Sequence, residues 1–330
     1  MDALLQDTRP AFGEEAAFQR GRRHVLSHLA SFGRHTISGL LRCQNRHQQD
    51  WSADYRFYSE ARFDQDRLFG RLRSAVETHL EPTRPLVVAM DDSLLRKTGR
   101  KIHGVRYQRD PLSPPFNVNF VRGLRVLQIS AAITQGGGAA RMVPIDFQHA
   151  VLPPKPPKKA TADELAAYQK LRAQRNINQV GRERLACLRQ QMDQAGSADR
   201  PLIVSIDGRF TNSTVLKKIP ERTTLIGRVR QDAVAYHPPG QQPPKGRKRK
   251  YGLPAPTPLA LLQDDTIPWQ SVPAFAAGQT HSFQVKSLGP VLLRMNQGTT
   301  PVRILVIKPL GYRLASHTYI TSIYLRDQPR

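Results

Sequence analysis

LVVAMDDSLLRKTGRK, residues 86–101, joins an apolar run to two adjacent carboxylates and then to a cluster of cations. The run from Leu86 to Met90 is short, follows a proline and predicts a buried β-strand. Asp91 and Asp92 come directly after it. Carboxylates at the end of a core strand call for a partner or a function, because burying an unpaired charge costs free energy.

A second segment, PLIVSIDGRF (residues 201–210), repeats this arrangement and places Asp207 after an apolar strand. The segment between the two predicts further strands at 117–134 and 141–151 and a long helix over 162–195. A first strand with two antiparallel neighbours, a helix and then a parallel strand beside the first would bring both strand ends together. Acidic oxygens meeting there suit Mg²⁺ or Mn²⁺ and two-metal phosphoryl transfer. We therefore expect an α/β (α+β) fold with a ribonuclease-H-like mixed sheet flanked by helices.

Two long blocks carry a family resemblance: VVAMDDSLLRKTGRKIHGVRYQRDPLSPPFNVNFVRG and VSIDGRFTNSTVLKKIPERTTLIGRVRQDA. In this order they resemble the DDE transposases of bacterial insertion sequences, which are ribonuclease-H-like DDE superfamily endonucleases, and the resemblance extends from about residue 20 to the C-terminus. It implies metal-dependent strand nicking and strand transfer at transposon ends. It also implies two Asp and one Glu that hold two Mg²⁺ (or Mn²⁺) ions, with double-stranded DNA, both transposon ends and target, as the partner. A homodimer on DNA is a further expectation.

The resemblance assigns roles to the acids residue by residue. Asp207 matches the second metal ligand, and the first falls on the pair Asp91–Asp92. The family pattern favours Asp92 as the ligand. Adjacent residues of a strand face opposite sides of the sheet, so only one of the two should face the metals. Asp91 is the alternative if the strand geometry has already broken.

The third acid of the family, a Glu on a later helix, has no match, because the chain contains no Glu after Glu221. Glu221 itself lies just past the second acid and is expected to be a turn residue. The resemblance thus predicts a chain truncated before the Glu-bearing helix and inactive on its own. The alternative is a non-catalytic DNA-binding remnant or regulator.

Three regions follow from the pattern of residues. Residues 1–85 predict a helical region, either a helix-turn-helix reader of DNA or a helical cap on the next domain. Residues 86–230 predict the catalytic core, with a hairpin turn at Gly136–Gly138. Residues 231–330 predict a β-rich insertion domain without helices.

The 50 Lys and Arg against 26 Asp and Glu give a formal net charge of +24 and a pI near 10.8, so nucleic acid is the expected partner. The positive excess lies almost entirely after residue 90. We expect phosphate contacts in two basic segments. The alternative for the first segment is an ordinary charged hairpin, and the alternative for the second is a solvated loop tip. The first contains Arg96, Lys97, Arg100, Lys101, Arg106 and Arg109, and the second contains Lys245, Arg247, Lys248, Arg249 and Lys250.

The sequence has only two cysteines, far apart, so a disulfide framework is not expected. It has no apolar run of about 18 residues, so a transmembrane helix is not expected either. A reducing cytoplasm is the natural setting, and the resemblance implies a bacterial, nucleoid-associated protein. No HxH or HExxH spacing occurs, which argues against a zinc site.

Overall fold

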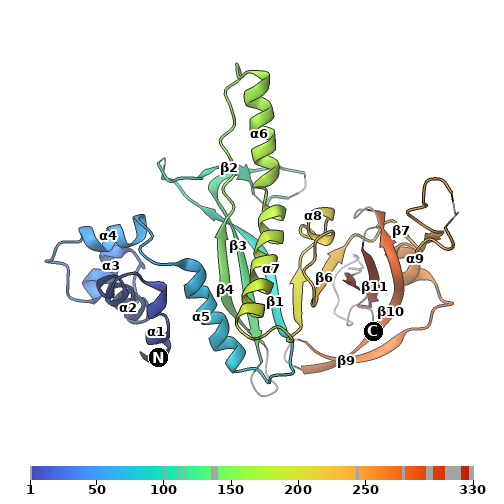
Figure 1. Cartoon of the computed structure of the whole chain (residues 1–330), viewed down its shortest axis with the longest axis horizontal. Coiled ribbons are helices and arrows are strands. Elements are labelled where there is room, and N and C mark those ends of the chain that lie inside the picture. The colour runs from blue at the N-terminus through green and yellow to red at the C-terminus, as the bar shows by residue number, and fades with distance from the viewer. Residues whose placement is uncertain are drawn as a thin grey trace. The chain divides into compact units, whose positions relative to one another are not determined.

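The computed structural model describes residues 2–99, 101–110, 112–114, 116–134, 140–242, 245–276, 279–294, 300–308 and 321–326. The chain divides into two compact units, Met1–His79 and Leu80–Arg330. Figure 1 shows the helices and strands in chain order. Within the described ranges no helix has both the length and the apolar character needed to cross a membrane. The Gly136–Gly138 turn lies outside the described residues.

The first unit is helical, as the apolar spacing predicts. It contains α1 (Asp2–Asp7), the 3₁₀ helix η1 (Arg9–Ala11), α2 (Glu15–Ala30), α3 (Ile37–Cys43), α4 (Ser52–Ser59) and α5 (Gln65–Thr78). Its core is aromatic: the ring of Phe12 lies 5.6 Å from Phe18 and 6.3 Å from Phe57, measured between centroids. All three side chains are buried, so this unit has a hydrophobic core of its own.

The second unit is built on a mixed sheet. Its first six strands are β1 (Leu86–Arg96), β2 (Arg106–Arg109), β3 (Phe120–Ile133), β4 (Arg141–His149), β5 (Leu202–Ile206) and β6 (Thr223–Val229). β1 pairs antiparallel with β3 and parallel with β5, β3 pairs antiparallel with β4, and β5 pairs parallel with β6. This is the strand arrangement expected for the ribonuclease-H-like fold, and the fold prediction is confirmed.

The C-terminal part continues the same sheet. Its elements are β7 (Ala235–Tyr236), β8 (Pro254–Ala255), α9 (Pro258–Gln263), β9 (Gln270–Ala276), β10 (Gln279–Leu293), β11 (Pro301–Ile307) and β12 (Thr321–Arg326). β12 pairs with both β6 and β11, which joins these strands to the core sheet. The expectation that this region lacks helices is wrong. α9 forms because the Thr257 side chain accepts a hydrogen bond from the Ala260 N–H, and Pro258 suits the first helical position.

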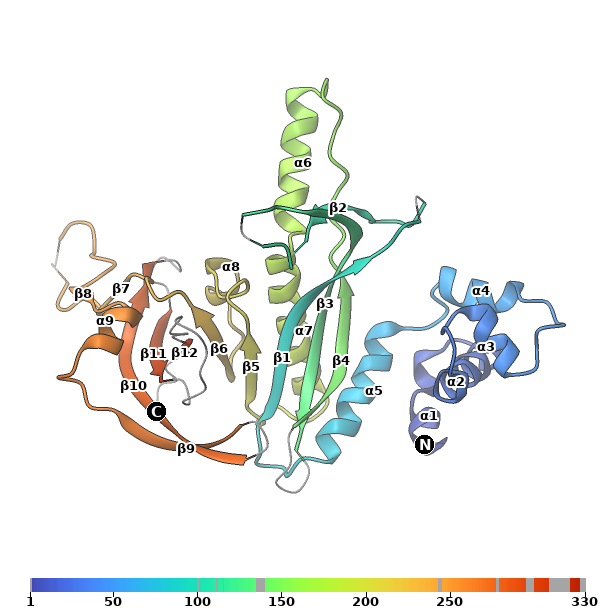
Figure 2. The same cartoon turned by 180° about the vertical axis from the view of Figure 1, so that it is seen from behind.

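Helices α6 (Ala162–Gln174), α7 (Ile177–Gln194) and α8 (Ser213–Leu216) complete the unit. The single helix predicted over 162–195 is therefore broken. Asn176 is extended, and its side chain accepts from the Gln179 N–H, so it caps α7 and ends the preceding helix. At Gly181, α7 comes so close to the core that an added Cβ would lie 3.0 Å from Phe210 and 3.3 Å from Met90. Figures 1 and 2 show α7 on one face of the sheet only.

The strand that carries the paired acids is longer than predicted. β1 does not end at Asp91 and Asp92 but continues to Arg96, because its antiparallel pairing with β3 extends to Arg96 opposite Gly123. Its parallel pairing with β5 stops earlier, at Met90 opposite Ile206. The acids thus lie where one neighbour of the strand ends and the other continues.

Candidate active site

Asp91 lies in β1, and Asp207 follows the end of the neighbouring parallel strand β5. Met90 and Ile206 are the last pair of this register, and Asp91 and Asp207 each follow directly after it. Paired residues on neighbouring strands share a sheet face, and the strands are about 4.8 Å apart. Met90 and Ile206, one residue earlier, are buried on the opposite face, which is covered by α7. We call the two surfaces the Asp91 face and the α7 face.

Asp92 points to the α7 face. Its side chain is only 6% exposed and forms an ion pair with Arg125 of β3, whose side chain is 10% exposed. Arg209 Nε lies 3.4 Å from the other carboxylate oxygen. This placement conflicts with the expectation that Asp92 faces Asp207. Alternation along an unbroken strand turns Asp91, the alternative left open by the sequence, to the other face, and the charge of Asp207 acts on it there.

The loop after β5 fixes the position of Asp207. Its Oδ1 accepts hydrogen bonds from the N–H groups of Arg209 (3.0 Å) and Phe210 (3.2 Å). The Phe210 side chain is fully buried beneath α7, next to Gly181. A turn closed by an aspartate and anchored by a buried ring is well defined. The carboxylate is therefore held in place at the end of β5.

The electrostatics of Asp91 agree with this geometry. Partial burial raises the pKa of the Asp91 carboxyl above its usual range, and the neighbouring carboxylates of Asp207 and Asp92 raise it further. The Asp92 N–H, which donates to Asp91 Oδ1 at 2.7 Å, and the positive charge of Arg209 oppose this increase. Among the described residues no Lys or Arg forms an ion pair with Asp91 or Asp207. Two unpaired, mutually repelling carboxylates in a chain of net charge +24 suit a bound cation.

The carboxylate oxygens of Asp91 and Asp207 suit a hard divalent cation, but a third acidic ligand is missing among the described residues. Asp91 and Asp207 offer carboxylate oxygens, the ligands that Mg²⁺ and Mn²⁺ prefer. Within the described part of the chain no group of three or more His, Cys, Asp or Glu side chains is placed to hold a metal. Glu221 is exposed in the turn before β6, in agreement with the role expected for it. The described residues thus provide two of the three acids that the resemblance implies.

The first basic segment lies on and beside β2. Lys97, Lys101 and Arg109 are exposed, whereas Arg96 forms an ion pair with the buried Asp110 at 2.7 Å. Arg106 is half-buried, and Arg100 lies outside the described residues. The second segment is an exposed loop between β7 and β8 that carries Lys245, Arg247, Lys248, Arg249 and Lys250. The structure therefore places the two segments on different parts of the sheet.

Two arginines beside the acids were missed by sequence reasoning. Arg209 follows Asp207 by two residues, so its position just after the second acid was a usable signal. Arg125 lies 33 residues after Asp92, and only the pairing of Leu94 with Arg125 brings it alongside. No local pattern reveals that contact.

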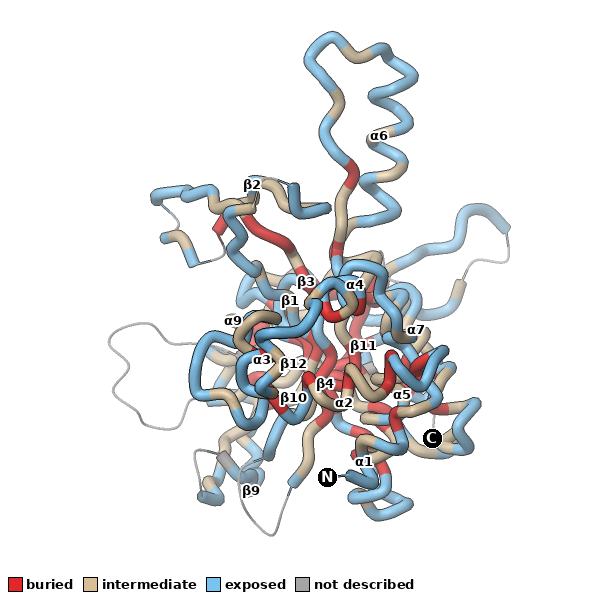
Figure 3. Tube along the Cα trace, turned by 90° about the vertical axis from the view of Figure 1, so that its left-hand side faces the viewer, coloured by how far each residue is buried: buried red, intermediate tan, exposed pale blue. Residues whose placement is uncertain are grey.

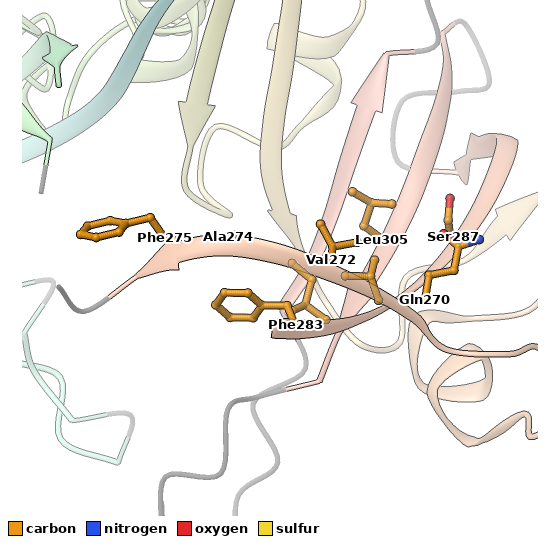
Figure 4. Close-up of a pocket in the computed structure, with 9 residues that line it drawn as sticks. Gln270, Val272, Ala274, Phe275, Phe283, Ser287 and Leu305 are labelled. Atoms are coloured by element: carbon orange, nitrogen blue, oxygen red, sulfur yellow. The ribbon is translucent and has the colours of Figure 1, made fainter. Parts of the chain in front are cut away.

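The C-terminal strands also form a cavity of about 490 Å³, shown in Figure 4. Its lining comes from β9, β10 and β11 and is mostly apolar, including Val272, Phe275, Phe283 and Leu305. The described residues that line it include no carboxylate and no cation. Its chemistry therefore does not suit a metal ion or a phosphate.

The comparisons with known proteins place the chain in a family. No curated protein matches the sequence. The family described as DDE superfamily endonuclease matches residues 8–287, which cover most of each unit and include Asp91, Asp92 and Asp207. This match confirms the resemblance seen in the two sequence blocks and supports a nuclease or transposase type of function on DNA. The chain belongs to the DDE superfamily endonuclease family.

Proposed function

We propose that this chain is the DNA-cleaving core of a DDE transposase, which nicks transposon ends and transfers the freed strand, and that Asp91 and Asp207 are its metal-ligating acids. The observation that supports the proposal is that Asp91 and Asp207 each follow the last pair of the β1–β5 register, Met90 and Ile206, and that the charge of Asp207 acts on Asp91. Members of the family generally use divalent metal ions and act on DNA. Mg²⁺ or Mn²⁺ is the ion that two aspartates favour.

The different roles proposed for Asp91 and Asp92 follow from their different surroundings. Metal ions bound by Asp91 and Asp207 would activate water or a 3′-hydroxyl and stabilise the leaving oxygen. Asp92 holds Arg125 and Arg209 from the α7 face. Arg209 has a side chain that is 43% exposed, so it remains accessible to a DNA phosphate while Asp92 orients it. Asp92 is thus a positioning residue, and its loss should impair cleavage through Arg209.

DNA binding rests on the exposed cations of the first basic segment. Lys97, Lys101 and Arg109 lie along the part of the sheet that continues from β1 beyond the acids. A strand of DNA that passes the acid pair and follows β1 and β3 would meet these cations through its phosphates. The loop at 245–250 offers a second basic surface. Both segments are proposed contacts for transposon-end or target DNA, and a homodimer on DNA belongs to the same proposal.

A second candidate is a DNA-binding protein that does not cleave. It is favoured by one observation, that the described residues bring together two acids and not three. Such a chain would bind transposon ends and compete with a complete enzyme.

A single experiment separates the two functions. Supercoiled plasmid and linear transposon-end DNA are incubated with the chain and Mn²⁺, and both nicking and retention of DNA are measured for wild type, Asp91→Asn, Asp207→Asn and the exposed control Asp199→Asn. The transposase predicts nicking by wild type and Asp199→Asn, no nicking by the other two variants, and DNA binding by all four. DNA binding without nicking by wild type is the result expected from the missing third acid, and it favours the second candidate. Absence of DNA binding contradicts both.

A further inference from the structure

The strands β2 and β3 form a two-stranded ribbon at the edge of the sheet, which we define as residues 106–109 paired with 120–123. In the pairing, Tyr107 lies opposite Arg122 and Arg109 lies opposite Phe120. Opposite residues share a face, and residues two apart on a strand also share a face. Tyr107, Arg109, Phe120 and Arg122 therefore form one surface of alternating aromatic and cationic side chains.

Exposure and neighbours make this surface unusual. Tyr107 is 72% exposed and Phe120 is 60% exposed, and two large aromatic residues exposed side by side form an apolar surface patch. The other face of the ribbon is approached by α6, since Arg106 is half-buried there and interacts electrostatically with Tyr168 and Arg172 of that helix. Figures 1 and 2 show α6 and β2 at the same end of the sheet, and Figure 3 shows how exposed both are. On the aromatic face of the ribbon, Tyr107, Arg109 and Phe120 are exposed.

The ribbon surface lies on the same side of the sheet as the proposed metal ligands. Asp91 is paired with Gln128 on β3, and residues 126 and 124 alternate onto that side within the β1–β3 register, which ends at Gly123. Residues 122 and 120 follow on the same side in the β2–β3 pairing, beyond the buried Leu124 and Val126. Gln128 and Phe120 are eight residues apart, which corresponds to about 26 Å along a strand. This is the length of roughly eight base pairs of duplex. A DNA that reaches the acids is therefore long enough to reach the ribbon as well.

We propose that the ribbon is a binding site for unpaired nucleobases of DNA, which stack on Tyr107 and Phe120 while the exposed Arg109 holds an adjoining phosphate. This inference rests on the proposed function, since it assumes that DNA is bound at the acid pair. Proteins bind single strands through aromatic platforms set among cations, because each base has a π-face and each nucleotide a negative charge. Paired bases are already stacked inside the duplex, so an exposed aromatic face selects bases that are unpaired or flipped out.

A second copy of the chain is a weaker occupant of this surface. Apolar side chains in the adjoining loop, Leu112 and Phe116, are also exposed and would favour association. However, Lys97 and Arg109 are exposed around the patch. Two copies meeting face to face would bring these like charges together, which costs free energy. A polyanion neutralises them instead.

The test compares two DNAs that carry the same number of phosphates. One is a fully paired duplex, and the other has mismatched, unpaired bases at one end. Affinities of the full chain are measured by fluorescence anisotropy at one salt concentration. Stacking contributes about 1–3 kcal/mol per base, so wild type should prefer the unpaired end by about tenfold or more. The double variant Tyr107→Ala/Phe120→Ala should lose this preference and bind the paired duplex within about twofold of wild type.

Three further variants separate stacking from other effects. Tyr107→Phe keeps the ring and should keep the preference. Phe275→Ala removes an exposed aromatic of β9 and should also keep it. Arg109→Gln should weaken binding to both DNAs alike and reduce the salt slope by about 0.9. Tyr107 and Phe120 are exposed, so unfolding temperatures should not change.

The outcomes that overturn the inference are distinct from those that overturn the function. Equal affinity of wild type for the two DNAs, or an unchanged preference in the double variant, refutes base stacking while leaving the transposase proposal intact. Failure to bind either DNA refutes both. Self-association of wild type that the double variant abolishes, without any preference for unpaired ends, assigns the surface to a second copy and refutes the inference.

Discussion

Replacing Asp92 by Asn separates a structural acid from a metal-ligating one. The ion pair between Asp92 and Arg125 is nearly buried, with the two side chains 6% and 10% exposed. Removing one partner of a buried pair typically destabilises by about 3–5 kcal/mol, because the other charge stays buried without compensation. Arg125 keeps one hydrogen bond, from its Nε to Gln108 Oε1 at 3.1 Å. We therefore expect a loss near the lower end, about 3 kcal/mol in the free energy of unfolding.

Asp91→Asn is the matched comparison on the neighbouring residue. Asp91 is exposed, has no ion pair among the described residues and is repelled by Asp207 and Asp92. Removing its charge relieves that repulsion, so the free energy of unfolding should change by less than about 0.5 kcal/mol, and the sign should be stabilising. The two substitutions are chemically identical and one residue apart, so the difference reports the environment alone.

The assay is urea unfolding without added metal. Trp269 lies in the second unit and Trp51 in the first, so a Trp51→Phe background makes the fluorescence report the unit that contains both acids. Thermal unfolding followed by circular dichroism checks the order of the variants. A large loss in Asp91→Asn together with an unchanged Asp92→Asn would refute the assignment of the two acids to opposite faces.

Three further predictions follow from other parts of the chain. Burial lowers the pKa of His24 below its ordinary value of 6.5, so on acidification the unfolded state is protonated before the folded state. The stability of the first unit should therefore be full above pH 6.5 and fall below it by up to about 1.4 kcal/mol per pH unit. His24→Gln should flatten this dependence in thermal scans. Lys97→Gln and Lys101→Gln should each reduce the slope of log K against log salt for DNA by about 0.9, whereas Arg96→Gln should reduce it less because Arg96 is already paired. Phe210→Ala should destabilise the second unit by about 3–5 kcal/mol, since the ring is fully buried and anchors the loop after β5; a loss below about 1 kcal/mol in urea unfolding would contradict that role.

Much of the core fold was predictable from local patterns. The strands β1, β3, β4 and β5 follow from apolar runs, and their order with an intervening helix implies the ribonuclease-H-like sheet. The errors lie where a local signal was overlooked. Thr257 and Pro258 are a recognisable helix start, as is Asn176 within the predicted long helix.

The candidate site was predictable only in part, for a physical reason. Alternation along a strand shows that Asp91 and Asp92 point in opposite directions. Which direction is the open one depends on the face that α7 covers, and this is decided by the fit of Gly181 against Met90 and Phe210. The contact of Asp92 with Arg125 likewise depends on the β1–β3 register. Both are tertiary properties that residue spacing does not contain.

Calorimetric titration of Mn²⁺ into the wild type and three variants tests the central assignment most directly. All proteins are measured at a temperature where thermal scans show them folded. The account predicts that Asp91→Asn and Asp207→Asn each weaken Mn²⁺ binding by at least about tenfold, since each removes one of two carboxylate ligands. Asp92→Asn should bind Mn²⁺ within about twofold of wild type, because its carboxylate is already paired with arginines on the other face. Wild-type affinity in Asp91→Asn together with lost binding in Asp92→Asn would contradict the account.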